Sequence, residues 1–527
     1  MNTKPINNEL LKHLKKPELI SILVIISLIF TRFYMLGIDI VNRDSFHFKN
    51  WSYVFMKEFE SHHWDKLFVA IQPGMLTIYS NIIGFKTLYF FKDKLHVVTA
   101  VGKEFELLLH IFQKIPQSSF IVILSVISFF LIYKLFNLKI ALLFALIYIF
   151  EPTFIIYSRF IQTDALQSIL IFCSLLFLFY WDKTQKNIHF IISGIFAGLA
   201  FIEKSSSIAL IPFIGLALVI LKVRGVGDFK NIKLYLNPVK KLVLFVALFF
   251  ATAFVFFPYY WFHPVQAFLR MTLDAFIHGV EGVMLDSYDF QRPDTLAIPS
   301  FKPDFSLLNY FYYHQTEIFL MGIGLFALLS IYLFLKKRKF DKKILLLFLF
   351  AFYYFLIVSI SNLRMERYMI VSAIPLALVS AYGINLFADF FKSRKIFVYL
   401  VFSALIFVLG LYVYFFYAPD WGAYSNLVAR SIKKDSVYVG GSGCFRLGEF
   451  LTQKYGSDRK IIIGDYTALY LYYPGEVVNY ERSLLTKEGY IVVAESNSDS
   501  DYIISQGYHQ IDRFDAKGNI SFYIYEK

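Results

Sequence analysis

The chain has 527 residues, of which 57% are hydrophobic, 20% aromatic and only 17% charged. A soluble protein of this length does not carry that ratio, so the composition indicates a polytopic membrane protein. The net charge of +13 does not indicate nucleic-acid binding, because the basic residues lie largely in short loops between apolar segments, where they set orientation and attract anionic lipid.

Apolar segments long enough to form membrane spans recur along the chain. A span needs about 20 predominantly apolar residues, and the sequence offers about eleven candidates. Their approximate bounds are Leu19–Leu36, Ser119–Phe136, Ile140–Ile156, Ala165–Trp181, Ile188–Ile202, Ile208–Leu221, Leu242–Trp261, Ile318–Leu335, Ile344–Ile360, Met369–Phe387 and Ile396–Phe416. The sequence therefore predicts an α-helical polytopic membrane protein with about 11 transmembrane helices.

The distribution of Lys and Arg between these spans predicts their orientation. Loops on the N-terminal side of the membrane are basic, and the run Lys336 to Lys339 is the clearest example. Short loops on the other side hold only Arg159, Lys204, Arg364 and Arg367. We therefore expect the N-terminus to be cytoplasmic, and an odd number of spans places the C-terminus outside.

Two parts of different composition follow one another. A membrane domain is expected over residues 1–417, with a first outer loop at 37–116 and a further outer loop at 258–316. Residues 418–527 are more polar and predict a small extracytoplasmic α/β domain, with helix within 431–455. Its strand-like runs are Ser436–Gly441, Lys460–Gly464, Tyr490–Glu495, Asp501–Ser505 and Ser521–Tyr525.

The first outer loop contains an aromatic pattern of helical period. Phe48, Trp51, Phe55 and Phe59 recur at three- and four-residue spacing. This pattern predicts an amphipathic helix that lies in the membrane interface. The alternative is a helix that packs on the protein itself.

The same loop carries candidate site residues. Asp44 follows the first span closely and sits at the membrane surface, where a carboxylate can accept a proton from a hydroxyl; the alternative is a solvated loop acid. His62 and His63, beside Trp64, are either ligands or a sugar platform, or else face water. Gln72 lies in the turn QPGML, which leads back toward the membrane.

Further charges lie at the ends of a two-helix hairpin. Asp164 begins one span, where it can serve a substrate or stabilise the helix N-terminus, and Arg159 precedes it. Lys204 ends the second span before three serines, which favours an anion site, unless Glu203 neutralises it. Both ends of a hairpin lie on the same side of a membrane.

Two arginines lie on that side as well. Arg364 and Arg367 are three residues apart, followed by Tyr368, and their guanidinium groups match a phosphate at the lipid boundary. The weaker alternative is that these arginines only help to set the membrane topology, because positive charge is disfavoured on that side. Together these residues predict an external pocket for a lipid phosphate that carries a group to be transferred.

Six segments resemble a known family. They are RDSF around Asp44, QPGMLTIYS, YSRFIQTDAL, SGIFAGLAFIEKSSSIALIP, FFPYYWFHP and RMERYMIVSAIPLAL, and they occur over about the first 390 residues. In this order they resemble motifs of the GT-C glycosyltransferases, specifically the family 39-like enzymes related to protein O-mannosyltransferases and the aminoarabinose transferase of lipid A. The C-terminal region matches no family that we can name.

The resemblance implies the GT-C fold and an inverting transfer of a sugar from a polyprenyl-phosphate donor to a hydroxyl of a protein, lipid or glycan acceptor. By position, Asp44 would be the catalytic base, and Asp164 would orient the acceptor or support the base. The donor phosphate would be bound by Lys204, Arg364 and Arg367. Candidate substrate-binding residues are Arg159, Gln72, His62, His63 and Tyr368.

Three positions depart from the family pattern. Ser45 stands where a second acid is frequent, which argues against a divalent metal cofactor, while Gln72 and Glu203 replace a usual histidine and threonine. Non-enzymatic alternatives are a transporter or flippase of lipid-linked sugars and an envelope assembly scaffold. A transporter favours charges at mid-membrane and repeated halves, whereas these charges lie at one lip and no repeat is visible.

Overall fold

The computed structural model describes residues 17–39, 41–70, 73–222, 233–274, 306–336, 341–361, 366–426, 443–463, 469–479, 489–494, 500–516 and 521–527. The candidate site residues Gln72 and Arg364 lie outside these ranges, as do the predicted strand at 436–441 and most of the predicted outer loop at 258–316.

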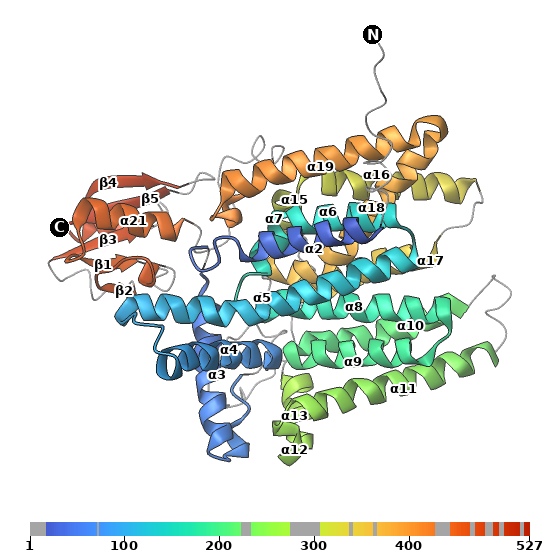
Figure 1. Ribbon diagram of the computed structural model, residues 1–527, viewed down its shortest axis with the longest axis horizontal. Helices are drawn as coiled ribbons and strands as arrows, with labels where there is room; N and C mark the ends of the chain where they lie inside the picture. Colours follow the sequence, from blue (N-terminus) through green and yellow to red (C-terminus); the bar gives the residue numbers. More distant parts are fainter. Residues whose placement is uncertain are drawn as a thin grey trace, which may run out of the picture.

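Long apolar helices form the body of the protein and run side by side (Figure 1). In the described ranges, eight helical segments are long and apolar enough to cross a membrane. They are Gly102–Leu135 (α5), Thr163–Thr184 (α8), Ser205–Lys222 (η3 and α10), Leu236–Phe256 (within α11), Glu317–Leu335 (α16), Lys342–Ile360 (α17), Arg367–Phe390 (η6 and α18) and Lys392–Tyr417 (η7 and α19). The shorter apolar helices α6 (Leu138–Phe150) and α9 (Asn187–Glu203), with α2 (Pro17–Phe33), lie at the other predicted positions. The chain is a multi-pass membrane protein, as predicted.

Two predicted spans are divided by proline. The segment Ile140–Ile156 forms α6 and then a separate short helix, α7 (Pro152–Tyr157), because Pro152 cannot continue the hydrogen bonding of α6. Glu151, which precedes the proline, is extended. Likewise, α11 (Lys233–Phe256) ends before Pro258, and α12 (Tyr259–Phe262) and α13 (Pro264–Leu269) follow.

The region between the first two predicted spans is itself helical. Helix α3 (Arg43–Glu60) crosses the direction of the long helices, and α4 (Met75–Tyr89) packs against α5 (Figure 1). On α3, Phe48 and Phe55 are only 5% and 3% exposed, and the Phe55 ring lies 6.0 Å from that of Tyr79 on α4. Most of the aromatic face of α3 therefore packs on the protein, which was the alternative to an interfacial helix.

A five-stranded mixed sheet follows the last long helix. Its strands are β1 (Lys460–Ile463), β2 (Val477–Asn479), β3 (Tyr490–Ala494), β4 (His509–Asp515) and β5 (Ser521–Glu526), in the order β2-β1-β3-β5-β4. β1 is parallel to β2 and β3, whereas β5 is antiparallel to β3 and β4. Helices α21 (Cys444–Tyr455) and α23 (Ser500–Ser505) accompany the sheet.

The predicted strand Asp501–Ser505 is wrong, because these residues form α23. A short apolar run cannot by itself separate a strand from a helical turn. Here Ile503 is buried while its neighbour Ile504 is exposed, and Gln506 closes the turn by donating to the carbonyl of Tyr502. The sequence also gave no sign of β2 and β4, which are short or mostly polar.

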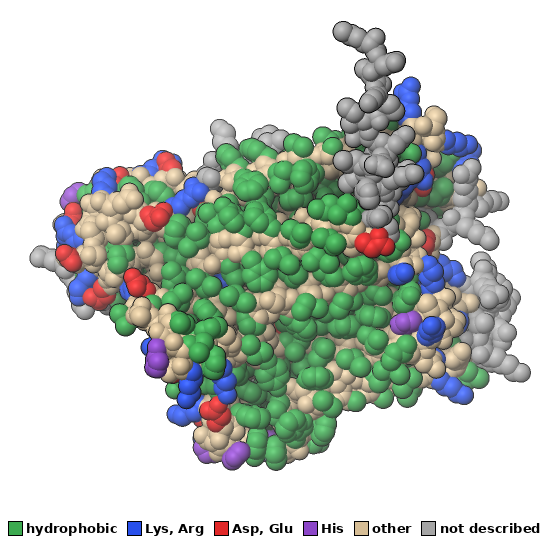
Figure 2. All heavy atoms as spheres, viewed as in Figure 1, with side chains coloured by type: hydrophobic (Ala, Val, Ile, Leu, Met, Phe, Trp, Pro, Cys, Tyr) green, Lys and Arg blue, Asp and Glu red, His purple; other side chains and the backbone are tan. Residues whose placement is uncertain are grey.

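Basic side chains gather at one end of the helix bundle. At the end far from the sheet, Lys183 donates to the carbonyl of Lys134 at 2.7 Å and Lys241 donates to Asn187 at 3.0 Å. Figure 2 shows Lys and Arg side chains gathered there and a broad hydrophobic band between them and the sheet. Of the predicted basic loops, the described residues Lys134, Lys183 and Lys241 therefore lie at one end, which we call the basic end.

The sheet region is held against the opposite end. Lys103, in the first turn of α5, donates to the carbonyl of Tyr473 at 2.7 Å, and the Tyr472 hydroxyl donates to the carbonyl of Asp39 at 2.6 Å. These bonds place the sheet beside the start of α5, on the side of the bundle where α3 lies (Figure 1).

Candidate active site

The candidate site begins where α8 and α9 return to the same end of the bundle. Asp164 lies in the first turn of α8, and Lys204 follows the last residue of α9 in an extended conformation. Nζ of Lys204 lies 2.5 Å from Oδ1 of Asp164, and the side chains are 5% and 3% exposed. The hairpin thus brings together two residues forty positions apart as a buried ion pair.

Arg367 joins this pair to Asp44. It lies in a single 3-10 turn, Glu366–Met369, before α18 (Ile370–Phe390). Its Nη1 forms an ion pair with Oδ2 of Asp44, and its Nε lies 3.6 Å from Oδ2 of Asp164. Nζ of Lys204 lies 3.8 Å from the ring centroid of Tyr368, a favourable cation–π contact. We call Asp44, Asp164, Lys204, Arg367 and Tyr368 the ionic cluster.

Accessibility differs within the ionic cluster. Asp44 and Arg367 are 31% and 24% exposed, whereas Asp164 and Lys204 are almost fully buried. A ligand that approaches from outside would therefore meet Asp44 and Arg367 first.

A polar group that the sequence analysis missed adjoins the ionic cluster. Gln167 lies one turn after Asp164 on α8 and donates to the hydroxyls of Ser206 and Ser207, both at 2.8 Å. The Ser206 hydroxyl lies 3.1 Å from that of Tyr354 on α17. The three-residue spacing of Asp164 and Gln167, which places both on one face of a helix, could have indicated this.

Glu203 does not neutralise Lys204. Its carboxylate accepts from the backbone N–H groups of Leu76 and Thr77, at 2.9 and 3.2 Å, and from the Thr77 hydroxyl at 2.5 Å. It therefore satisfies the free N–H groups at the N-terminus of α4.

Gly74, just before α4, has φ +57°, and a Cβ there would lie 2.4 Å from the Phe48 ring, so only glycine fits.

Arg159 lies in a second, fully buried ionic group rather than in the ionic cluster. Its Nε donates to Oδ2 of Asp39 at 2.6 Å, Nζ of Lys114 donates to Oδ1 of Asp39 at 2.6 Å, and the Trp421 ring lies 4.4 Å from the guanidinium. Burial alone would raise the pKa of Asp39, but Arg159 and Lys114 outweigh it and hold that pKa below its ordinary value. The sequence analysis missed Asp39 and Lys114 because neither lies in a recognisable motif.

The two histidines lie elsewhere. His62 and His63 follow the last turn of α3, whereas Asp44 lies in its first turn, so the length of an 18-residue helix separates them. Nδ1 of His63 lies 2.7 Å from Oε2 of Glu58, and the His62 ring lies 5.4 Å from that of Trp64.

The residues of the ionic cluster do not fit a divalent ion. Both carboxylates face Arg367, and the Ser45 hydroxyl is used in a 2.6 Å bond to Oδ1 of Asn42. Within the described ranges, no three His, Cys, Asp or Glu side chains are grouped as metal ligands.

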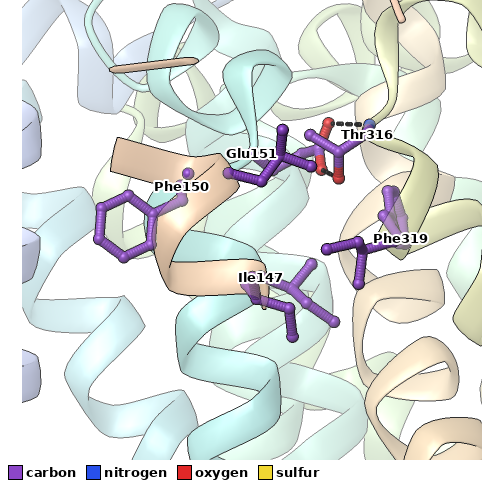
Figure 3. Close-up of a pocket in the computed structure, with 9 residues that line it drawn as sticks. Ile147, Phe150, Glu151, Thr316 and Phe319 are labelled. Atoms are coloured by element: carbon purple, nitrogen blue, oxygen red, sulfur yellow. Dashed lines mark hydrogen bonds between the residues drawn. The ribbon is translucent and has the colours of Figure 1, made fainter. Parts of the chain in front are cut away.

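A small cavity lies apart from the ionic cluster. It is lined by residues of α6, α16 and α19, among them Ile147, Phe150, Glu151 and Phe319, and its volume of about 10 Å³ suits one water at most. Figure 3 shows the Glu151 carboxylate directed at Thr316, whose N–H and hydroxyl donate to it at 2.9 and 2.7 Å. Glu151 is thus bound by Thr316, the N-cap residue of α16, and a hollow of this size is too small for a sugar or a phosphate.

Comparison with protein families matches part of the chain. Residues 106–252 match the model of the dolichyl-phosphate-mannose-protein mannosyltransferase family. The predicted family resemblance is confirmed over this segment. The segment includes Asp164 and Lys204 but not Asp44 or Arg367. No curated protein matches the chain.

Solved structures of low identity also align with the chain. ArnT from Cupriavidus metallidurans in the apo state is 13% identical, with a TM-score of 0.47, over 95% of this chain and 97% of that one. The same protein bound to undecaprenyl phosphate is 12% identical, with a TM-score of 0.44, over 95% of this chain and 97% of that one. The Archaeoglobus fulgidus oligosaccharyltransferase in the apo form is 12% identical, with a TM-score of 0.46, over 97% of this chain and 74% of that one.

Proposed function

We propose that this protein is a membrane glycosyltransferase that moves a sugar from a polyprenyl-phosphate donor to a hydroxyl of a protein, lipid or glycan acceptor. The observation that carries the proposal is the ionic cluster. Asp44, Asp164, Lys204 and Arg367 come from segments far apart in the chain, yet each contacts another member of the cluster. The family match over residues 106–252 supports the same reaction class.

Asp44 is the proposed base. In the reaction, the acceptor oxygen forms a bond to the anomeric carbon while the bond from that carbon to the phosphate oxygen breaks. Asp44 takes the proton of the acceptor hydroxyl, and polyprenyl phosphate leaves with the bond electrons, so the anomeric centre inverts. Asp44 suits this role better than Asp164, because it is the more exposed carboxylate of the ionic cluster.

Arg367 is the proposed principal phosphate ligand, with Arg364 beside it in the sequence. A guanidinium donates two parallel hydrogen bonds to a phosphate and stabilises the charge that develops as the phosphate leaves. Arg367 forms an ion pair with Asp44. A donor phosphate that takes over this guanidinium would release Asp44 to accept a proton. Donor binding would thereby activate the base.

Lys204 is proposed to act on the same phosphate from a deeper position. Its ammonium is held by Asp164 and by the ring of Tyr368, so it supplies a fixed positive charge beneath Arg367. Asp164 then orients both cations.

The ionic cluster is proposed to face the outside of the cytoplasmic membrane, with the sheet region there too. The last turn of α8 lies at the basic end, where Lys343 is 3.6 Å from Asp182, and the first turn of α8 carries Asp164. A 22-residue helix is about 33 Å long, enough to cross the bilayer core. Because cytoplasmic loops are enriched in Lys and Arg, the basic end is proposed to be cytoplasmic.

The test measures binding of undecaprenyl phosphate to the full chain in lipid nanodiscs. We expect saturable binding that Arg367→Ala weakens at least tenfold. The matched control is Arg394→Ala, an exposed arginine of η7 (Lys392–Arg394), which should bind as the parent does. Absence of binding by the parent, or equal weakening in both variants, would contradict the proposal. Mass analysis of envelope lipids, glycans and proteins in a deletion strain would then identify the sugar and its acceptor.

A further inference from the structure

Two pairs of residues join the segment before α3 to the segment before α8, and a third link joins the first turns of these two helices. Asp39 pairs with Arg159 at 2.6 Å, and Nδ2 of Asn42 donates to Oε1 of Gln162 at 2.7 Å. Arg367 connects Asp44 to Asp164. The partners are 120 residues apart in the first two pairs, and Asp44 and Asp164 are separated by the same number.

The middle pair joins the two helix starts. Asn42 is the N-cap of α3 and Gln162 is the N-cap of α8, and each acid lies two residues after its cap. Oδ1 of Asn42 accepts from the N–H of Ser45 at 3.0 Å, so one side chain both caps α3 and reaches α8. Asp44 and Asp164 therefore occupy equivalent positions on two helices whose N-cap side chains are hydrogen-bonded to each other.

Helix α5 fixes the two segments from one side. Lys114 bonds to Asp39, and one turn later Nε2 of Gln117 donates to the carbonyl of Gln162 at 2.7 Å. Lys114, Gln117 and Gln162 are each about 1% exposed. Such buried bonds resist solvent competition, so the two segments are held in one register.

We infer that Asn42 and Gln162 are positioning residues, whose hydrogen bond sets the separation and orientation of Asp44 relative to Asp164. Within the part of the chain that the structure describes, neither side chain forms a hydrogen bond with Arg367, Lys204 or Tyr368, so both act through the acids that follow them. The inference rests on the proposed function, because positioning has a catalytic consequence only if the two acids act together. A displacement of about 1 Å at a reacting group can reduce the rate about 100-fold.

The test uses substitutions that keep the local fold. Asn42→Ser retains an oxygen that can cap α3 but is too short to reach Gln162. Gln162→Met keeps the volume and the backbone carbonyl that accepts from Gln117, and removes the side-chain amide whose Oε1 accepts from Asn42. The matched control is Asn137→Ser, because Asn137 caps α6 in the same way, by accepting from the N–H of Ile140 at 3.0 Å, away from the ionic cluster.

The rate of sugar release and the affinity for undecaprenyl phosphate, measured separately, distinguish positioning from donor binding. With polyprenyl-phosphate mannose as the probe, Asn42→Ser and Gln162→Met should each lower the rate of sugar release about tenfold. The affinity of each variant for undecaprenyl phosphate should change less than twofold. The double variant should be no slower than either single variant, because both remove one bond. Independent, multiplying losses, or an equal loss in Asn137→Ser, would overturn the inference.

A readout independent of activity keeps the two proposals distinguishable. Spin labels at His47→Cys on α3 and Ile188→Cys on α9 report the placement of α3 against the hairpin, and both native cysteines are buried, so only the introduced ones are labelled. The distance distribution should broaden or shift in Asn42→Ser and in Gln162→Met but not in Asn137→Ser. An unchanged distribution overturns the positioning role. A parent that binds no undecaprenyl phosphate instead refutes the proposed function.

Discussion

Lys204 and Asp164 form an ion pair from which water is almost excluded, with 2.5 Å between Nζ and Oδ1. Removing Lys204 leaves the buried Asp164 carboxylate with only the longer, 3.6 Å contact to Arg367. We expect Lys204→Ala to lower the free energy of unfolding by about 3–5 kcal/mol, measured as a lower apparent Tm of the protein in detergent.

Lys86→Ala is the matched control for that substitution. Lys86 pairs with Glu60 at 3.0 Å, but both side chains are more than half exposed. Its removal should cost less than about 1 kcal/mol. If both variants lost the same stability, the buried pair would not have the importance that we give it.

Asp44→Asn should abolish sugar transfer without unfolding the protein. The amide cannot take the acceptor proton, so the rate should fall by more than about 100-fold, since general-base catalysis contributes about 10²–10⁴-fold. Undecaprenyl phosphate should still bind, because Arg367 is released from its carboxylate partner. Asp65→Asn, at an exposed acid of the 3-10 turn Trp64–Lys66, should transfer at the parental rate. Full activity of Asp44→Asn would exclude Asp44 as the base.

Glu203→Ala should destabilise α4 locally. The variant loses all three bonds that Glu203 accepts from Leu76 and Thr77, and loss of a helix cap costs about 0.5–2 kcal/mol. Hydrogen exchange of residues 75–79 should accelerate. Asp341→Ala removes the cap of α17, where Oδ1 accepts from the N–H of Lys343 at 2.9 Å, and should accelerate exchange there instead. No change at α4 would show that Glu203 has another role.

The group around Asp39 should make stability depend on acid pH. Arg159 and Lys114 hold the pKa of Asp39 below its ordinary value of 3.8, although burial opposes them. A lowered carboxyl pKa contributes stability above the unfolded value, and this contribution is lost as pH falls through the folded value. The apparent Tm should therefore fall below about pH 4. In Asp39→Asn this part of the acid transition should disappear, and the apparent Tm at pH 7 should already be lower than that of the parent. In the control Asp458→Asn, the dependence of the apparent Tm on pH should match that of the parent.

Tyr472→Phe should weaken attachment of the sheet region. Its hydroxyl donates to the carbonyls of Gly37 and Asp39, at 3.1 and 2.6 Å, and a buried acceptor left without a donor costs about 1–3 kcal/mol. Exchange protection in β1 should fall together with that of the residues before α3. Tyr470→Phe is the control, because the Tyr470 hydroxyl contacts a side chain, that of Glu106 at 3.3 Å, in place of the backbone before α3. Equal effects of the two variants would contradict the special role of Tyr472.

Much of the helical fold was predictable from hydropathy. Eight predicted spans coincide with helices that are long and apolar enough to cross a membrane, and the other three contain the shorter helices α2, α6 and α9. Burying about 20 apolar residues in lipid leaves little choice of structure. The break at Pro152 was missed because apolar composition continues across it, and the same composition led the span Leu242–Trp261 to be extended past residue 258, where the outer loop was expected to begin. The helix α23 was predicted as a strand, since a run of five residues such as Asp501–Ser505 has no reliable period.

The candidate site was predictable only in part. Asp44, Asp164, Lys204 and Arg367 were selected as ionic residues at one membrane lip, and the structure places them in contact. The partner of each charge was not predictable. Glu203 is adjacent to Lys204 in the sequence, but its side chain faces α4, and Arg159 is directed to Asp39 through tertiary packing that no local pattern encodes.

The equal spacing of the two paired segments has an evolutionary consequence. A residue inserted between Asp39 and Asp44 would detach one carboxylate from its counterpart unless a matching insertion arose between Arg159 and Asp164. In descendants of this chain, lengths elsewhere in the loops can drift freely, whereas these two short intervals should change together.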